Sequence, residues 1–188
     1  MNTRFAEQVR RRVFAIGPDL VVFLGDLAGG FRKGGKSQNV DRGIAALEGY
    51  SAPLGAWAIL GNHDWEDDLE AHHRGHGPNR ATALLEQAGW RVLENEAREL
   101  ENGLWLAGLA SQRAIKAWHP RGARFRGLDD LDGTLAQIPA DKSLLLLAHE
   151  PDIFPKVPAR VGLTIAGHTH GGQILTFGKP WTVHSEFG

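Results

Sequence analysis

Four short apolar runs divide the chain, and residues that can bind metals or move protons follow each of them. The runs cover residues 20–24, 56–60, 144–148 and 161–166. Continuous apolar runs of this length are typical of strands that are covered on both faces, as in a parallel sheet. The polar residues come in the same order: Asp26, then Asn62, His63 and Asp64, then His149, and last His168 and His170. Because ligands of open α/β sheets gather just past the carboxyl ends of strands, the pattern predicts one site there.

Helical spacing of apolar residues accounts for much of the chain between these runs. Residues 4–16 place Phe5, Val9, Val13 and Ile16 at helical intervals with arginines between them, which predicts an amphipathic helix. Further helices, each closed by a nearby glycine or proline, are expected over residues 40–47, 81–88 and 128–138.

A hairpin signal changes the expected class of sheet. Short strands are predicted over residues 90–93, 97–101 and 104–109, and Asn102-Gly103 separates the last two. A purely parallel fold has no place for a hairpin at this point. The sequence therefore indicates a mixed sheet, or a second sheet.

Three polar segments are expected to be loops, over residues 31–39, 66–80 and 111–127. The second holds His72, His73 and His76 among charges, and we expect a solvated loop above the site, with nothing that fixes these rings for metal binding. The third is basic and rich in tryptophan and arginine. A solvated loop is favoured for it, and binding of phosphate or of a partner is the alternative.

Composition excludes several classes of protein. At 188 residues the chain suits one domain, expected over residues 1–188, and its net charge of −1 indicates no general attraction to nucleic acid. Without cysteine, metal ligands must be histidine, carboxylate or amide oxygen. No apolar run reaches the roughly 18 residues of a membrane span, and the amino terminus lacks a signal-peptide core, so a cytoplasmic protein is expected.

The sequence Gly167-His168-Thr169-His170 is the strongest single indication of a metal site. Side chains two residues apart in extended chain point to the same side, so both imidazoles can face one small volume. Imidazole is the commonest nitrogen ligand for transition metals, but a site needs three or four donors. A polar loop with both histidines in water is the alternative for this pair taken alone.

The polar residues after the first two runs supply further donors. Asn62 can offer an amide oxygen to a metal, His63 can move a proton, and Asp64 can orient His63 through the other ring nitrogen. Asp26 is a carboxylate at a strand end, although a turn or helix cap is an alternative role for it. A turn without chemistry is likewise the alternative for residues 62–64.

Taken together, these residues resemble the motifs of the calcineurin-like metallophosphoesterase superfamily. The matching pieces are Gly25-Asp26, Gly61-Asn62-His63-Asp64, His149-Glu150-Pro151-Asp152 and the stretch of residues 167–173, which is most similar to small bacterial phosphodiesterase-like members. The resemblance implies an α/β fold, a four-layer α/β/β/α sandwich of two mixed β-sheets flanked by helices.

The same resemblance implies a two-metal site at the strand ends. Asp26 would bridge both metals, Asn62, His149 and His168 would complete one of them, and His170 would belong to the other. The chain departs from the family in one respect, because no Asp-x-His precedes Asp26. We therefore expect an N-terminally truncated form of the fold that lacks its first strand, with one well-held ion and a second that is weak or absent.

The resemblance also implies the reaction, which is hydrolysis of phosphate monoesters or diesters of small molecules by metal-activated water. Manganese, iron, zinc or nickel all suit such ligands. His63 would protonate the leaving oxygen, and Asp64 would hold its orientation. A non-catalytic scaffold and a mononuclear metallo-esterase of broad specificity are the alternatives. Without the first strand, an unpaired sheet edge also suggests a homo-oligomer.

Overall fold

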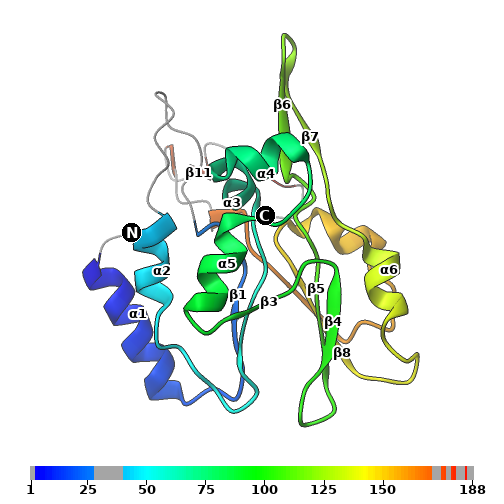
Figure 1. Ribbon diagram of the computed structural model, residues 1–188. Helices are drawn as coiled ribbons and strands as arrows, with labels where there is room; N and C mark the ends of the chain where they lie inside the picture. Colours follow the sequence, from blue (N-terminus) through cyan, green and yellow to red (C-terminus); the bar gives the residue numbers. More distant parts are fainter. Residues whose placement is uncertain (1–2, 28–39, 171–174, 177–178, 181–184, 186–188) are drawn as a thin grey trace.

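Two β-sheets lie face to face in the computed structural model, and helices cover the outer side of each sheet (Figure 1). The structure describes residues 3–27, 40–170, 175–176, 179–180 and 185. The loop expected at residues 31–39 lies outside this range. The expected four-layer arrangement of helices, sheet, sheet and helices is confirmed.

The first sheet has the strand order β1-β2-β3. Its strands are β1 (Val21–Phe23), β2 (Ala56–Ala58) and β3 (Arg91–Val92), and all of them are parallel. A mixed sheet was expected here, but the described part of this sheet is parallel. Parallel neighbours need long crossover connections, and the chain fills these with helices.

The second sheet has the order β4-β5-β8-β9 and is mixed, as expected. Its strands are β4 (Glu96–Glu99), β5 (Trp105–Gly108), β8 (Leu144–Ala148) and β9 (Leu163–Ala166). β4 and β5 are antiparallel, whereas β5, β8 and β9 are parallel. The predicted hairpin is confirmed: Gly103 has a φ of 81°, and the Leu104 N–H donates to Asn102 Oδ1 at 3.2 Å.

The remaining elements surround these sheets. The helices are α1 (Thr3–Ile16), α2 (Val40–Leu47), α3 (Asn62–Asp67), α4 (Leu69–Arg74), α5 (Arg80–Gln87), α6 (Leu131–Ala136) and the 3₁₀ helix η1 (Pro151–Lys156). Two antiparallel ribbons complete the described structure: β6 (Ile115–His119) with β7 (Gly122–Arg126), and β10 (Leu175–Thr176) with β11 (Lys179–Pro180).

Two of the expected loops are in fact ordered elements. Within residues 66–80, Asp68 accepts from the Ala71 N–H at 3.0 Å, and Gly75 closes the turn at a φ of 73°, so α4 forms there. Ala71 is fully buried, which fixes this helix on the core. Residues 111–127 contain the β6–β7 ribbon. Both loop assignments were wrong because polar surface residues concealed these local signals.

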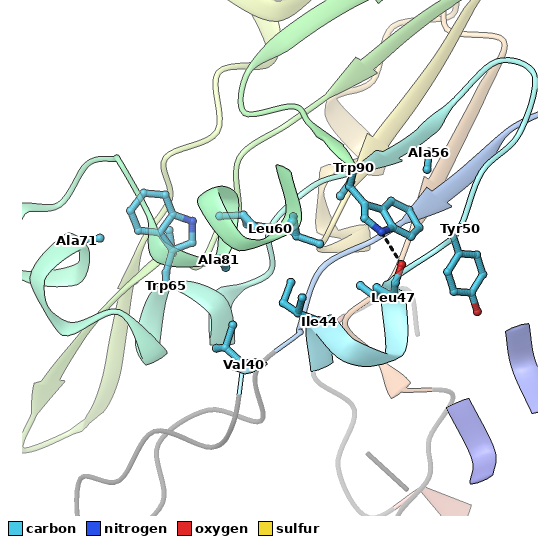
Figure 2. Packing of buried hydrophobic residues seen from close by; sticks show 13 residues of the cluster. Val40, Ile44, Leu47, Tyr50, Ala56, Leu60, Trp65, Ala71, Ala81 and Trp90 are labelled. Carbon is cyan, nitrogen blue, oxygen red and sulfur yellow. Dashed lines mark hydrogen bonds between the residues drawn. The ribbon is translucent and has the colours of Figure 1, made fainter. Parts of the chain in front are cut away.

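Side chains alternate between two cores along the buried strands. Trp57 and Ile59 point into the space between the sheets, where they meet Leu106 and Leu147. The intervening side chains Ala58 and Leu60 belong to the opposite cluster, which α2 and α5 cover. Figure 2 shows this second cluster, including Ile44 and Trp90, whose indole N–H donates to the Leu47 carbonyl at 2.9 Å.

A third cluster lies on the outer side of the second sheet. Leu146 and Ala107 pack there against Leu135, near the end of α6, and against Ile153 of η1. The sheets are thus fixed from both sides, and the loops that leave the ends of β1, β2, β8 and β9 start from rigid positions. β1 pairs with β2 in the described sheet and is otherwise its edge strand. The expected association of two chains at this edge stays a prediction.

Glu94, which follows β3, generates a stability prediction. Burial is the main cause that raises its pKa to about 7, with the neighbouring Glu96 and Asp64 adding to the rise. Thr82 Oγ1 donates to its Oε2 at 3.5 Å, while its buried Oε1 accepts no hydrogen bond from the described residues. The folded protein therefore holds a proton here more tightly than the unfolded chain, so the contribution of Glu94 to stability is most favourable at low pH and is lost as pH rises through about 7.

We predict that Glu94→Gln raises the free energy of unfolding by about 1–3 kcal/mol at about pH 8 and changes it little at about pH 4. Urea unfolding at both pH values measures this, and Glu101→Gln, at an exposed position, is the matched control. Equal gains at both pH values, or none at about pH 8, would contradict the assignment of this pKa to Glu94.

Candidate metal centre

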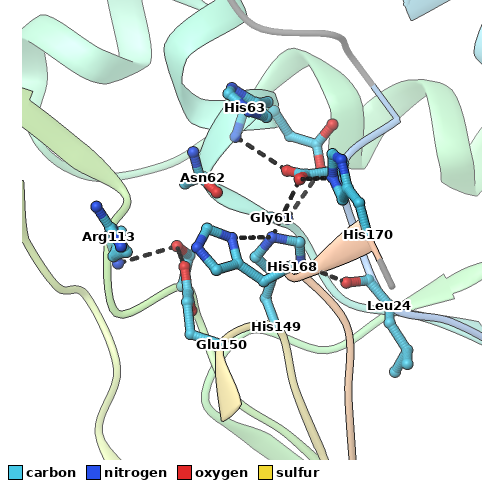
Figure 3. A network of polar contacts seen from close by, with 12 residues as sticks. Leu24, Gly61, Asn62, His63, Arg113, His149, Glu150, His168 and His170 are labelled. Atoms are coloured by element: carbon cyan, nitrogen blue, oxygen red, sulfur yellow. Dashed lines mark hydrogen bonds and ion pairs between the residues drawn. The ribbon is translucent and has the colours of Figure 1, made fainter. Parts of the chain in front are cut away.

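Three potential ligands from three separate loops converge at one edge of the sheets. Asp26 follows β1, His149 follows β8, and His168 follows β9. One ligand atom from each lies within 4.8 Å of the others (Figure 3). Among the described residues, these three form the group of histidine and carboxylate side chains that could hold a metal ion.

The ring of His149 lies at the centre of this cluster. Its Nε2 is 3.3 Å from Asp26 Oδ2 and 3.3 Å from Nδ1 of His168. The side chain is only 1% exposed. Two imidazole nitrogens that face each other and a carboxylate suit a shared cation, because each carries a lone pair when it is neutral.

A backbone carbonyl fixes the orientation of this ring. Nδ1 of His149 lies 2.6 Å from the Leu24 carbonyl oxygen, which accepts a hydrogen bond and carries no proton to give. The Nδ1–H therefore donates, and the neutral ring presents the lone pair of Nε2 to the cluster. Metal-binding histidines are characteristically oriented in this way by a second partner.

Asn62 supplies the observation that tests whether a metal fits. The side chain is 4% exposed, and its Nδ2 lies 3.5 Å from Glu66 Oε1. Its buried Oδ1 accepts no hydrogen bond from the part of the chain that the structure describes. Figure 3 shows the amide directed towards the histidine rings. A buried amide oxygen without a partner is costly, and a divalent metal would satisfy it.

His170 approaches the same carboxylate from a more open position. Its Nε2 is 3.4 Å from Asp26 Oδ2, and its side chain is 54% exposed. Asp26 Oδ2 thus faces His149 on one side and His170 on the other. A cavity of about 410 Å³ opens beside these residues, and Leu24, Ala166 and Thr169 also line it. A small substrate can reach the cluster from this side.

The backbone of the site adopts left-handed conformations that side chains rarely take. Asp26, His168 and His170 have φ values of 61°, 67° and 53°. Among the described non-glycine residues, Asn95 is the one further residue with a positive φ. Such conformations cost about 1–3 kcal/mol each and persist only where surrounding contacts hold them. Their concentration here is typical of a functional site.

Two glycines allow the strand ends to approach one another. A Cβ at Gly61 would collide with Asp26 Oδ1 and lie 2.6 Å from Cε1 of His149. Gly25 has a φ of 90°, and a Cβ there would meet the backbone of Gly61. Glycine at these two positions is therefore required for the carboxylate and imidazole to lie so close.

Asp64 does not occupy the position that the sequence suggested. Its Oδ2 accepts from the backbone N–H of Gly61 at 2.8 Å and of Asp26 at 2.9 Å, so it joins the loops after β1 and β2. The carboxylate beside His63 belongs to Glu66, whose Oε2 is 3.6 Å from Nδ1 of His63. Glu66 rather than Asp64 lies beside the His63 ring, because α3 places residues three apart on one face.

The charges of the site follow from these contacts. Burial would raise the pKa of Asp26, but the hydrogen bond and charge of His149 outweigh it and hold the pKa well below its usual range. Burial would lower the pKa of His149, but Asp26 raises it. The Glu66 carboxylate raises the pKa of His63, although burial opposes this. Asp26 and His149 therefore form an ion pair, and a metal ion that bound them would displace the proton of His149.

The three histidines of residues 66–80 lie outside this cluster. Nε2 of His72 accepts from the Lys116 N–H at 2.9 Å, and Nδ1 of His76 lies 2.8 Å from the Gly77 carbonyl oxygen. His73 is exposed on α4. Glu66 is a neighbour of the site that the sequence alone did not indicate. Two features could have pointed to it: a helix that begins after Gly61, and the i, i+3 spacing of His63 and Glu66.

The fold and the cluster of potential metal ligands at its strand ends place the chain in a known family. The sequence model of the calcineurin-like phosphoesterase family matches residues 3–172, nearly the whole chain. The chain belongs to this family, whose members typically bind divalent metals.

Relatives with curated names agree with this assignment. An uncharacterized metallophosphoesterase of Aquifex aeolicus is 31% identical over 92% of this chain and 58% of its own length. The uncharacterized metallophosphoesterase YkuE of Bacillus subtilis is 32% identical over 84% of this chain and 49% of its own. UDP-2,3-diacylglucosamine pyrophosphatase LpxG of Chlamydia trachomatis is 25% identical over 94% of this chain and 60% of its own.

The chain spans about half the length of the curated relatives it matches. No solved structure shows a significant match. None of the helices among the described residues has the length and apolar character needed to cross a membrane.

We predict that Gly61→Ala lowers the affinity for Mn²⁺ or Zn²⁺ by about 10-fold or more, because the added methyl group displaces Asp26 or His149. Calorimetric titration of the metal measures the loss, and Gly162→Ala, which meets only ordinary contact distances, is the control. Unchanged affinity in a folded Gly61→Ala protein would show that the metal binds elsewhere.

Proposed function

We propose that the chain hydrolyses phosphate esters of small molecules, with one divalent transition metal held by Asp26, Asn62, His149 and His168. The proposal rests on the convergence of Asp26, His149 and His168 at strand ends. The buried Oδ1 of Asn62 lies beside them. Manganese, iron, zinc and nickel all suit this ligand set, and His170 would contact a second ion that is held less tightly.

The metal would supply a Lewis acid that lowers the pKa of a water and neutralises phosphoryl oxygens. The residues of the chain would position the metal and transfer the proton. Asp26 and His149 would fix the place of the metal, because their mutual contact and the Leu24 carbonyl hold both side chains in position. The Glu66 carboxylate raises the pKa of His63, which favours the protonated ring that would give its proton to the leaving oxygen.

His63 is well placed for this proton transfer. Its backbone N–H donates to Asp26 Oδ1 at 3.1 Å, and its side chain is 30% exposed at the first turn of α3. The ring is thus next to the cluster and still reachable by substrate. Glu66, which is 2% exposed, holds the far side of the ring.

A panel of substrates tests the proposed reaction against its two alternatives. An aryl phosphate, an aryl phosphodiester and a carboxyl ester are incubated with the protein plus Mn²⁺, Zn²⁺, Ni²⁺ or Fe²⁺, and separately with chelator. We expect metal-dependent cleavage of phosphate esters that chelator abolishes. Cleavage of the carboxyl ester alone would support the mononuclear metallo-esterase, and no cleavage with metal bound would support the non-catalytic scaffold.

We predict that His63→Ala lowers the phosphoesterase kcat by about 100-fold or more while the metal content stays near that of the wild type. The physical reason is that the ring transfers a proton without being a ligand. Kinetics together with elemental analysis measure both quantities, and His73→Ala on the exposed face of α4 is the control. Joint loss of metal and activity would make His63 a ligand.

A second prediction concerns Glu66 as a positioning residue. Glu66→Gln should lower kcat by about 10-fold with little change in KM, because the neutral amide holds His63 less firmly. The same substitution in the His63→Ala protein should have almost no further effect. Glu70→Gln, exposed on α4, is the control. Equal losses from Glu66→Gln with and without His63 would show that Glu66 acts through something else, such as Asn62.

A further inference from the structure

The β6–β7 hairpin has no role in the proposed chemistry, and its composition is unusual for a surface element. Its strands pair with each other along five residues, from Ile115 opposite Arg126 to His119 opposite Gly122. Neither strand joins the two large sheets. Figure 1 shows the hairpin projecting away from the body of the molecule, beyond α3 and α4.

An exposed tryptophan lies close to the tip of this hairpin. Trp118 is 81% exposed, more than any other large hydrophobic residue of the described chain. Leaving an indole in water is unfavourable unless another surface covers it. Cross-strand neighbours do not cover it, since Trp118 faces the small side chain of Ala123.

The hairpin segment is strongly basic. Residues 111–127 contain five cationic side chains and no carboxylate, namely Arg113, Lys116, Arg121, Arg124 and Arg126. The exposed ones include Arg121 beside the turn and Arg124 on β7. Because the net charge of the whole chain is −1, the rest of the chain is acidic on balance, although α1 also carries four arginines.

Cations and aromatic rings support each other along one face. Lys116 Nζ lies 4.9 Å from the centre of the Trp118 ring and 5.7 Å from that of Phe125. The guanidinium of Arg113 lies 4.1 Å from the centre of the Phe125 ring. These contacts hold the indole at a defined place near the tip.

The base of the hairpin is tied to the helices that carry the site. Lys116 Nζ is 3.6 Å from Glu66 Oε1, and the Lys116 N–H donates to His72. Arg126 donates to the Gly75 carbonyl at 3.3 Å. A molecule bound at the tip would therefore lie at a defined distance from α3 and from the cluster of Asp26, His149 and His168.

We propose that the β6–β7 hairpin docks the protein on the surface of an anionic lipid bilayer. Trp118 enters the headgroup region, where an amphipathic indole is stable, and Arg121 and Arg124 contact lipid phosphates. A bilayer fits better than nucleic acid because it touches only the projecting tip. A nucleic acid that tracked along the molecule would meet the acidic remainder of the chain.

Sedimentation with vesicles tests the docking, and it does not depend on catalysis. The whole chain is mixed with phosphatidylcholine vesicles that contain about 30% phosphatidylglycerol, or with pure phosphatidylcholine, at low and at physiological salt. We expect binding to the anionic vesicles, weakened by salt, and little binding to the neutral ones. Absence of binding to the anionic vesicles at low salt would overturn the proposal.

Variants at the tip locate the binding surface. Each exposed arginine near an anionic surface contributes a factor of about five, so Arg121→Glu with Arg124→Glu should weaken binding by about 25-fold or more. Trp118→Ala should weaken it several-fold. The matched controls on α1 are Arg11→Glu with Arg12→Glu, and Phe5→Ala, all at exposed positions.

The controls should change vesicle binding less than twofold. All variants alter exposed side chains, and thermal unfolding verifies that each is folded. Equal effects of the hairpin and α1 variants would overturn the proposal, because binding would then follow net charge alone. Tighter binding to a DNA duplex than to the anionic vesicles would also overturn it and would assign the hairpin to nucleic acid.

Discussion

The contact between His149 and its two neighbours from the first sheet is the constraint on which the site depends. Nδ1 of the ring meets the Leu24 carbonyl, and Nε2 meets Asp26, so a residue at the end of β8 is held by the end of β1. These strands belong to different sheets. These side chains can meet only if the two sheets pack in one relative position, so the candidate metal centre depends on the whole sandwich.

The core between the sheets provides that position. Because strand side chains alternate, a shift of one residue in β2 and the two residues after it would exchange Trp57 and Ile59 with Ala58 and Leu60. Side chains of the wrong size would then lie in both cores. Register is therefore strongly specified by packing. The same packing supports the left-handed backbone at Asp26 and His168, whose local cost must be met by stability elsewhere.

The sequence predicted the buried strands and the convergence of their ends because both follow from local patterns, whereas the four-layer arrangement was implied by the resemblance to the metallophosphoesterase superfamily. Apolar runs mark buried strands, and parallel strands bring their carboxyl ends to one edge. It did not predict the partner of His63, because that required the start of α3, and Gly61 reads equally well as a turn. The β6–β7 hairpin was missed for another reason. β6 shows no regular alternation of apolar and polar residues, β7 alternates over only five residues, and only Pro120-Arg121-Gly122 marks the turn between them.

Anomalous X-ray diffraction from crystals of the protein grown with Mn²⁺ or Zn²⁺ tests the central claim most directly. The account predicts a strong anomalous peak within about 2.0–2.3 Å of donor atoms from Asp26, Asn62, His149 and His168. A weaker peak beside His170 would be consistent with a second, loosely held ion. A metal-loaded crystal with no peak among these four residues, or with its strongest peak at the His72 and His73 helix, would contradict the account.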